Sequence, residues 1–261
     1  MGRQAPTGGD RVGALASSEA VLEAAFWGFV GGVALIVGAV LGLAWNVSSR
    51  VVGGVMAFGA GVLISAVAFD LVEEGYERAG TTPVLVGLAA GAFAFATGDY
   101  ILNRNGGGDR KRSGGQQAGG AAMAIALGAM LDGIPESAAI GVTLLGAGGV
   151  GVAMVAAVFL SNVPESMSAA VGLRKAGRSV RWILGLWLAV TAVSAAAAAV
   201  GYAVLGGAPE STVAVVQAFA AGAILTMLAD TMMPEAFEDT GPLTGVITCA
   251  GFVCAFLLSH L

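Results

Sequence analysis

Eight apolar segments, each about as long as a bilayer is thick, divide the sequence. A helix needs about 20 mostly apolar residues to cross a membrane. The segments lie at 20–45, 51–73, 82–103, 120–145, 149–173, 181–205, 211–234 and 241–260. Charged residues make up only 11% of the chain and the mean hydropathy is +0.85, whereas soluble domains carry about 25% charge. The sequence therefore predicts an all-α membrane protein with eight transmembrane helices.

The polar regions between these segments predict how the chain is oriented. Residues 1–19 are expected to form a disordered extracytoplasmic tail, and 104–119 a Gly-rich, flexible cytoplasmic loop within a single transmembrane domain, 20–261. Basic residues favour the cytoplasmic side. With both termini extracytoplasmic, Arg3, Arg11 and Arg78 lie outside, and nine basic residues lie inside: Arg50, Arg104, Arg110, Lys111, Arg112, Arg174, Lys175, Arg178 and Arg181.

A weak internal repeat relates the second and seventh segments. Residues 57–77 and 218–238 are identical at seven of 21 positions, including two glutamates. The predicted topology runs these helices in opposite directions, which is the inverted repeat of many secondary transporters. The chain is therefore predicted to have a 3+2+3 arrangement, in which spans 1–3 and 6–8 are inverted copies around central spans 4 and 5.

Spans 4 and 5 share an unusual motif, LDGIPES at 131–137 and LSNVPES at 160–166. Counted from the short connection at 146–149, at 1.5 Å per residue, the two motifs lie roughly 20 and 23 Å along their helices and thus at nearly the same depth. Each proline leaves a carbonyl without its usual hydrogen bond. Oxygen atoms from both helices are thus expected to converge near the middle of the membrane: those of Asp132, Glu136, Ser161, Asn162 and Glu165.

Three acids at this depth need a compensating interaction. Each charged side chain costs at least about 2.5–3.5 kcal/mol at the centre of a membrane helix, and no Lys or Arg lies in a span core. A divalent cation would neutralise two carboxylates at once, so the motif predicts a cation site on a transport path. A protonated, hydrogen-bonded packing cluster is the alternative.

Two further aspartates lie where such a path would open. Asp70 lies at the outer end of span 2, next to several glutamates, and Asp230 lies on the inward half of span 7. A negatively charged mouth concentrates cations, so Asp70 is predicted to line the entrance and Asp230 the exit.

The doubled Pro-Glu motif, the eight spans and the basic loop after span 3 resemble the ZIP (Zrt/Irt-like) family of divalent metal transporters. Residues 218–235 are similar to its bacterial GufA-like branch. The resemblance covers about 20–261. It implies zinc as the transported substrate, with manganese, iron or cadmium as further candidates, uptake toward the cytoplasm, a bacterial cytoplasmic membrane, elevator-like alternating access and a homodimer.

Several positions depart from the family pattern. Asp132 stands where the family has histidine and Gly133 where it has asparagine, whereas Glu136 and Glu165 match; Ser161 takes a His/Gln position, and Asn162 is permitted. No acid is found in span 6, where the branch places one near Ser194, and Asp230 replaces a histidine. The resemblance thus implies one primary metal site and puts a second in doubt. Oxygen ligands suit Mg, Mn and Ca better than imidazole sites do.

Other functions explain less of the sequence. A non-transporting relative, acting as a metal sensor or structural membrane protein, is the main alternative, and a proton-coupled carrier of another substrate is a further one. An intramembrane aspartyl protease built on Asp132 and Asp230 would leave the doubled Pro-Glu-Ser unexplained. No enzymatic activity, catalytic cofactor or nucleic-acid partner is therefore expected.

Overall fold

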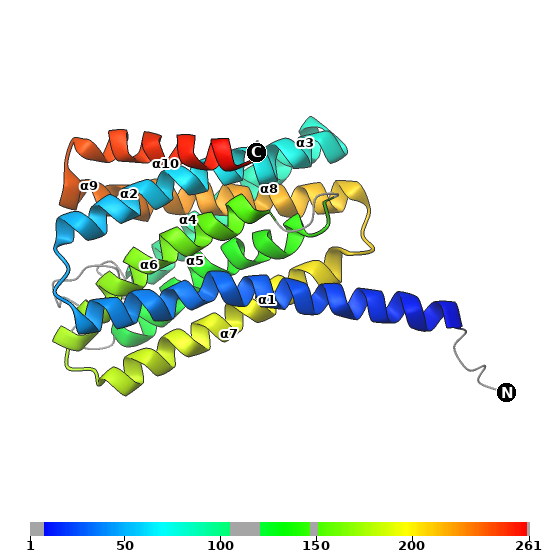
Figure 1. Ribbon diagram of the computed structural model, residues 1–261. Helices are drawn as coiled ribbons and strands as arrows, with labels where there is room; N and C mark the ends of the chain where they lie inside the picture. Colours follow the sequence, from blue (N-terminus) through cyan, green and yellow to red (C-terminus); the bar gives the residue numbers. More distant parts are fainter. Residues whose placement is uncertain (1–7, 105–120, 147–150, 260–261) are drawn as a thin grey trace.

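The computed structural model describes residues 8–104, 121–146 and 151–259, and every regular element in these ranges is helical. This confirms the predicted all-α class for the described residues. The helices run back and forth along one common direction (Figure 1). With η for a π-helical segment, the bounds are α1 Gly8–Ala44, α2 Ser49–Ala66, η1 Val67–Glu73, α3 Glu74–Ala79, α4 Thr81–Leu102, α5 Ala121–Thr143, α6 Val152–Lys175, α7 Val180–Leu205, α8 Glu210–Met227, η3 Leu228–Met232, α9 Met233–Thr240 and α10 Leu243–Ser259.

Six helical stretches among the described residues are long and apolar enough to cross a membrane: Ser18–Ala44, Ser49–Ala79, Thr81–Leu102, Val152–Lys175, Val180–Leu205 and Glu210–Thr240. The apolar stretch of α10, Leu243–Leu258, is shorter, and α5 coincides with the predicted segment 120–145. Large apolar side chains such as Phe93 and Val246 are exposed on the outer helices, as lipid contact requires. The chain is thus an integral membrane protein by length and composition, and the eight-span 3+2+3 arrangement remains a prediction.

The first helix begins earlier than the sequence predicted. Because α1 starts at Gly8, residues 8–19 are helical where a disordered tail was expected. Residues 14–16 are Ala-Leu-Ala, which favour helix, and no proline lies between Gly8 and the apolar segment. Residues 1–7 and 105–120, which include the start of the expected tail and nearly all of the expected loop, lie outside the described residues.

The two helices that carry the sequence repeat have the same length, and each contains a π-helical segment. Ser49–Ala79 and Glu210–Thr240 each span 31 residues. In both, 18 α-helical residues precede the π-helical segment, and a glycine with positive φ follows the last turn: Gly80 at 75° and Gly241 at 61°. The two helices run in opposite directions (Figure 1). The repeat therefore extends from the side chains to the backbone.

Close helix contacts through glycine follow the same pattern. Small residues let helices in a membrane approach closely. At several positions a Cβ in place of hydrogen would overlap a carbonyl oxygen of the neighbouring helix, and four of these close approaches join the repeated helices α2 and α8 to α10 and α4. The approaches are Gly61 to Thr248 and Gly251 to Phe58 between α2 and α10, and Gly222 to Leu88 and Gly91 to Phe219 between α4 and α8. Each of the two repeated helices thus packs closely against one further helix, α2 against α10 and α8 against α4.

The two proline-containing helices, α5 and α6, lie inside the bundle. In Figure 1, α5 and α6 lie between the pair α1 and α7 and the pair α2 and α8. The apolar window of α6 is 67% buried, against 28% for α4. α6 packs chiefly on α1 and α2, and α5 on α7 and α8, whereas the contact of α5 with α6 is smaller. The motifs therefore meet at a narrow contact inside the bundle.

Candidate functional site

Pro135 and Pro164 lie inside α5 and α6, where each removes one helix hydrogen bond. The carbonyl groups that lose their usual partner belong to Leu131 and Leu160, four residues earlier. The carbonyl oxygen of Leu160 faces α2, because a Cβ on Gly59 would lie 3.1 Å from it. The backbone of α2 thus closely approaches the proline-disrupted turn of α6.

A hydrogen bond between Glu136 and Ser161 joins the two motifs. Both residues are 1% exposed. The Ser161 hydroxyl lies 3.3 Å from Oε1 of Glu136 and 3.0 Å from the carbonyl oxygen of Val158. A serine has a single hydroxyl hydrogen, and O–H···O bonds usually measure 2.5–3.0 Å. The bond to Glu136 is therefore the longer of two that share one donor.

The other three predicted ligands are buried in the same two helices. Asp132 lies one turn before Glu136, and Glu165 lies one turn after Ser161. The three acids and the serine are all buried. Asn162 is directed to α1, since its Nδ2 donates to the carbonyl oxygen of Gly31 at 3.1 Å. The structure thus brings Glu136 and Ser161 together, and it uses the Asn162 amide to hold α6 against α1.

The carboxylates do not form a compact cluster in this arrangement. Among the described residues, no group of three or more His, Cys, Asp or Glu side chains lies close enough together to hold a metal ion. We call the level of the bundle that holds Asp132, Glu136, Ser161, Asn162 and Glu165 the central layer. A ligand set drawn from this layer would combine carboxylate with hydroxyl, amide or backbone carbonyl oxygen. Such mixed oxygen sets are typical for hard divalent cations.

Helix α7 adds polar side chains that the motif did not predict. Thr191 is fully buried and donates to the carbonyl oxygen of Gly32 in α1 at 2.8 Å. Ser194 is also buried, and a Cβ on Gly133 would lie 3.7 Å from its Oγ. Hydroxyl residues three apart in an apolar helix share a face, which is the signal that could have placed them in this layer.

Asp70 lies in η1 and contacts the start of α6. Its carboxylate accepts a hydrogen bond from the backbone N–H of Met154, and a Cβ on Gly151 would lie 3.2 Å from its Oδ2. The first N–H groups of a helix have no partner within it, and a carboxylate there is favoured by the helix dipole. Asp70 therefore stabilises the first turn of α6, a contact that the sequence did not predict.

Asp230 lies in η3, and its side chain is exposed. This is the second of the paired π-helical segments, and π-helical turns are frequent at functional sites. Both predicted pathway residues thus lie in the interrupted turns of the repeated helices.

A polar network next to Asp70 joins α3 and α8 at the same end of the bundle. Arg78 of α3 contacts Glu74 at 2.5 Å and Glu210 at 2.9 Å. The side-chain amide of Gln217 in α8 donates a hydrogen bond from Nε2 to the other carboxylate oxygen of Glu74 at 3.2 Å. Gln217 is fully buried. The network links the repeated helix Ser49–Ala79 to α8 through charged hydrogen bonds.

The two ion pairs of Arg78 should differ in strength. Glu210 is 65% exposed and Glu74 only 27%. Exposed pairs contribute about 0.2–1 kcal/mol, whereas a partly buried carboxylate without its partner costs about 1–3 kcal/mol. We expect Glu210→Gln to lower the free energy of unfolding by under about 1 kcal/mol and Arg78→Gln by clearly more. Thermal unfolding in detergent measures both, and equal losses would contradict this ranking.

Comparison with protein-family models and with curated proteins finds no match to this chain.

Proposed function

We propose that the protein is a divalent metal transporter of the ZIP type, which moves zinc toward the cytoplasm. The observation that carries the proposal is the burial of Asp132, Glu136 and Glu165 in two neighbouring helices, each interrupted by proline next to its glutamate. Carboxylates are costly at membrane depth, and buried charges are generally paired or bind metals. A transported cation accounts for both their burial and their position.

The cation site of this proposal lies where α5 and α6 meet. Glu136 and Ser161 are already in contact, and Asp132, Asn162 and Glu165 lie within one turn of them along the same helices. A long hydrogen bond that shares its donor costs little to exchange for a metal–oxygen contact. Gly133 and Ser194, where the resemblance expects ligands of a second metal, face each other without an acid. We therefore propose one metal site.

The proposed path connects this site to both sides of the membrane. The excess of basic residues favours an orientation with the Asp70 end outside and the end of α6 inside. A cation enters past Asp70, loses water, binds at the central layer and leaves past Asp230, as α5 and α6 with the two repeated helices shift against the rest. Asp70 holds the first turn of α6, so the entrance carboxylate is linked directly to a ligand helix.

Two arguments bear on the identity of the metal, and they favour different metals. The family resemblance favours zinc, which accepts carboxylate ligands. The oxygen-only ligand set favours harder cations such as manganese or magnesium. We place zinc first, with manganese, iron and cadmium next.

Uptake into proteoliposomes tests the proposal. Purified protein is compared with Glu165→Ala for uptake of Zn, Mn, Fe(II), Cd and Mg, and Glu23→Ala, an exposed glutamate of α1, serves as the control. We expect Glu165→Ala to lose uptake and Glu23→Ala to retain it, while the ranking of metals identifies the substrate.

Two results would overturn parts of the proposal. Full uptake by Glu165→Ala would show that the cation does not use the central layer. No uptake of any metal by folded protein would favour a non-transporting sensor or structural role.

A further inference from the structure

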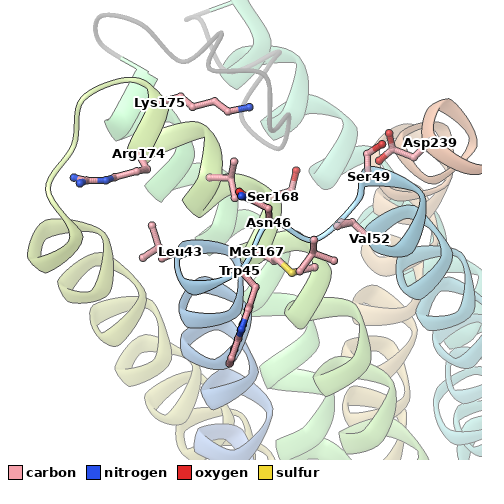
Figure 2. A pocket seen from close by; sticks show the side chains of 13 residues that line it. Leu43, Trp45, Asn46, Ser49, Val52, Met167, Ser168, Arg174, Lys175 and Asp239 are labelled. Atoms are coloured by element: carbon pink, nitrogen blue, oxygen red, sulfur yellow. The ribbon is translucent and has the colours of Figure 1, made fainter.

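A pocket of about 370 Å³ lies where α1 ends, α2 begins and α6 ends, with Asp239 of α9 on its far side (Figure 2). This volume is within the range of small-molecule sites, about 300–1,000 Å³. The pocket lies at one end of the helices, and its lining belongs neither to the Glu136–Ser161 contact nor to the Arg78 network. It therefore has no role in the function proposed so far.

The charge around the pocket is mainly positive. Lys175 extends over the pocket in Figure 2, whereas Arg174, in the same turn, points toward the connection to α7 and donates to the carbonyl oxygen of Arg178 at 3.4 Å. Asp239 is the acid in the lining, and it is hydrogen-bonded by the Ser49 side chain. The lining thus carries two basic side chains and one acidic side chain, and this balance favours an anionic ligand.

The same end of the bundle carries nearly all the basic side chains that the structure describes. Arg78 is at the opposite end; the others at this end are Arg50, Arg104, Arg174, Lys175, Arg178 and Arg181. Basic residues near the membrane surface attract anionic lipids, and basic pockets between membrane helices bind their head groups. Basic residues in a last helical turn also stabilise the helix itself. The charge therefore indicates a lipid site only because a pocket lies beside it.

The lining has separate polar and apolar parts, as an amphiphilic ligand requires. The polar residues Asn46 and Ser168 lie below Lys175, and Ser49 lies beside Asp239 (Figure 2). Trp45 points away from this polar level, along α1, and is 62% exposed. Tryptophan prefers the level of lipid head groups. A soluble anion would use only the polar part, whereas a phospholipid would use both.

We propose that this pocket binds the phosphate-bearing head group of an anionic membrane phospholipid. Lys175 attracts the phosphate, Arg174 adds to the positive potential at this end of α6, the amide of Asn46 donates a hydrogen bond to the phosphate, and Trp45 packs against the beginning of the acyl chains. The proposal is independent of cation transport, because neither the ligand nor the residues are shared with the central layer.

Lipid binding by the full-length protein in detergent tests the proposal. Native mass spectrometry measures the affinity for phosphatidylglycerol, with phosphatidylcholine as the neutral lipid and glycerol 3-phosphate as the soluble phosphate. The double variant Arg174→Gln/Lys175→Gln is compared with Arg178→Gln/Arg181→Gln, which removes the same charge at the same end outside the pocket. Val171→Phe keeps the charges and narrows the pocket.

We expect the pocket double variant to bind phosphatidylglycerol roughly 10- to 30-fold more weakly than the wild type, since each basic residue near the surface contributes about a factor of five, and the control double variant to lose much less. Val171→Phe should also weaken binding. Equal losses in both double variants would show that only general surface charge acts. Glycerol 3-phosphate binding as tightly as the lipid, or equal binding of both lipids, would also overturn the proposal. Arg174 and Lys175 are exposed, so their replacement leaves folding intact.

Discussion

Glu136→Gln is expected to abolish saturable metal uptake while the protein stays folded. Glutamine keeps the size of the side chain and removes its charge at a site that is 1% exposed. Removing one partner of a buried charge interaction costs about 3–5 kcal/mol, and each 1.4 kcal/mol is a factor of ten. We therefore expect uptake at low metal concentration to fall about 100-fold or more in proteoliposomes.

The stability of Glu136→Gln is not expected to fall along with its uptake. An ionisable group in the middle of a membrane helix is costly, so replacing Glu136 by a neutral side chain should leave the thermal unfolding temperature unchanged or raise it. Glu23→Gln, at an exposed position, is the control for both measurements. Unchanged uptake in Glu136→Gln would refute a ligand role, and a large loss of stability would favour the hydrogen-bonded packing cluster instead.

Gly251→Ala is expected to destabilise the protein strongly for so small a change. A Cβ at this position in α10 would overlap the carbonyl oxygen of Phe58 in α2. Rigid backbone atoms cannot rotate away, so the two helices must separate. Overpacking of this kind typically costs about 1–3 kcal/mol, which thermal unfolding in detergent measures.

Gly245→Ala, in the same helix, provides a control of opposite sign. No atom lies within 4 Å of a Cβ placed there, and alanine favours helix over glycine by up to about 1 kcal/mol in water. We expect this variant to be as stable as the wild type or more so. If both variants lose the same stability, the close contact of α2 with α10 at Gly251 is not the cause of the loss.

The repeat could be predicted from residues 57–77 and 218–238, but its extent could not. Seven identities between two Ala- and Gly-rich stretches mark the related helices. The shared length of 31 residues and the paired π-helical turns depend on how each helix packs against its neighbours, and local sequence says little about this. The length of α1 was likewise underestimated, since residues 8–19 lack the apolar pattern of a span.

The residues of the central layer could be predicted from the sequence, but only some of their contacts could. The spacing within each motif and the shared depth correctly brought Glu136 next to Ser161. The same reasoning placed Asn162 among the cation ligands, which stays a prediction, but it missed that the amide nitrogen donates to the backbone of α1 at Gly31. Asp70 was assigned to an entrance, and its bond to the start of α6 was missed. Both contacts join segments far apart in the chain, and the sequence alone does not specify such pairings.

The contact of α2 with α10 also limits the order in which the protein can assemble during synthesis. Roughly 190 residues separate the facing positions Phe58 and Gly251. At about 5–20 residues per second, a ribosome needs on the order of 10–40 s to make that stretch. Throughout this interval the glycine face of α2 has no final partner, and lipid or the insertion machinery must cover it. Helix α10 therefore completes an interface whose other face, on α2, is synthesised much earlier.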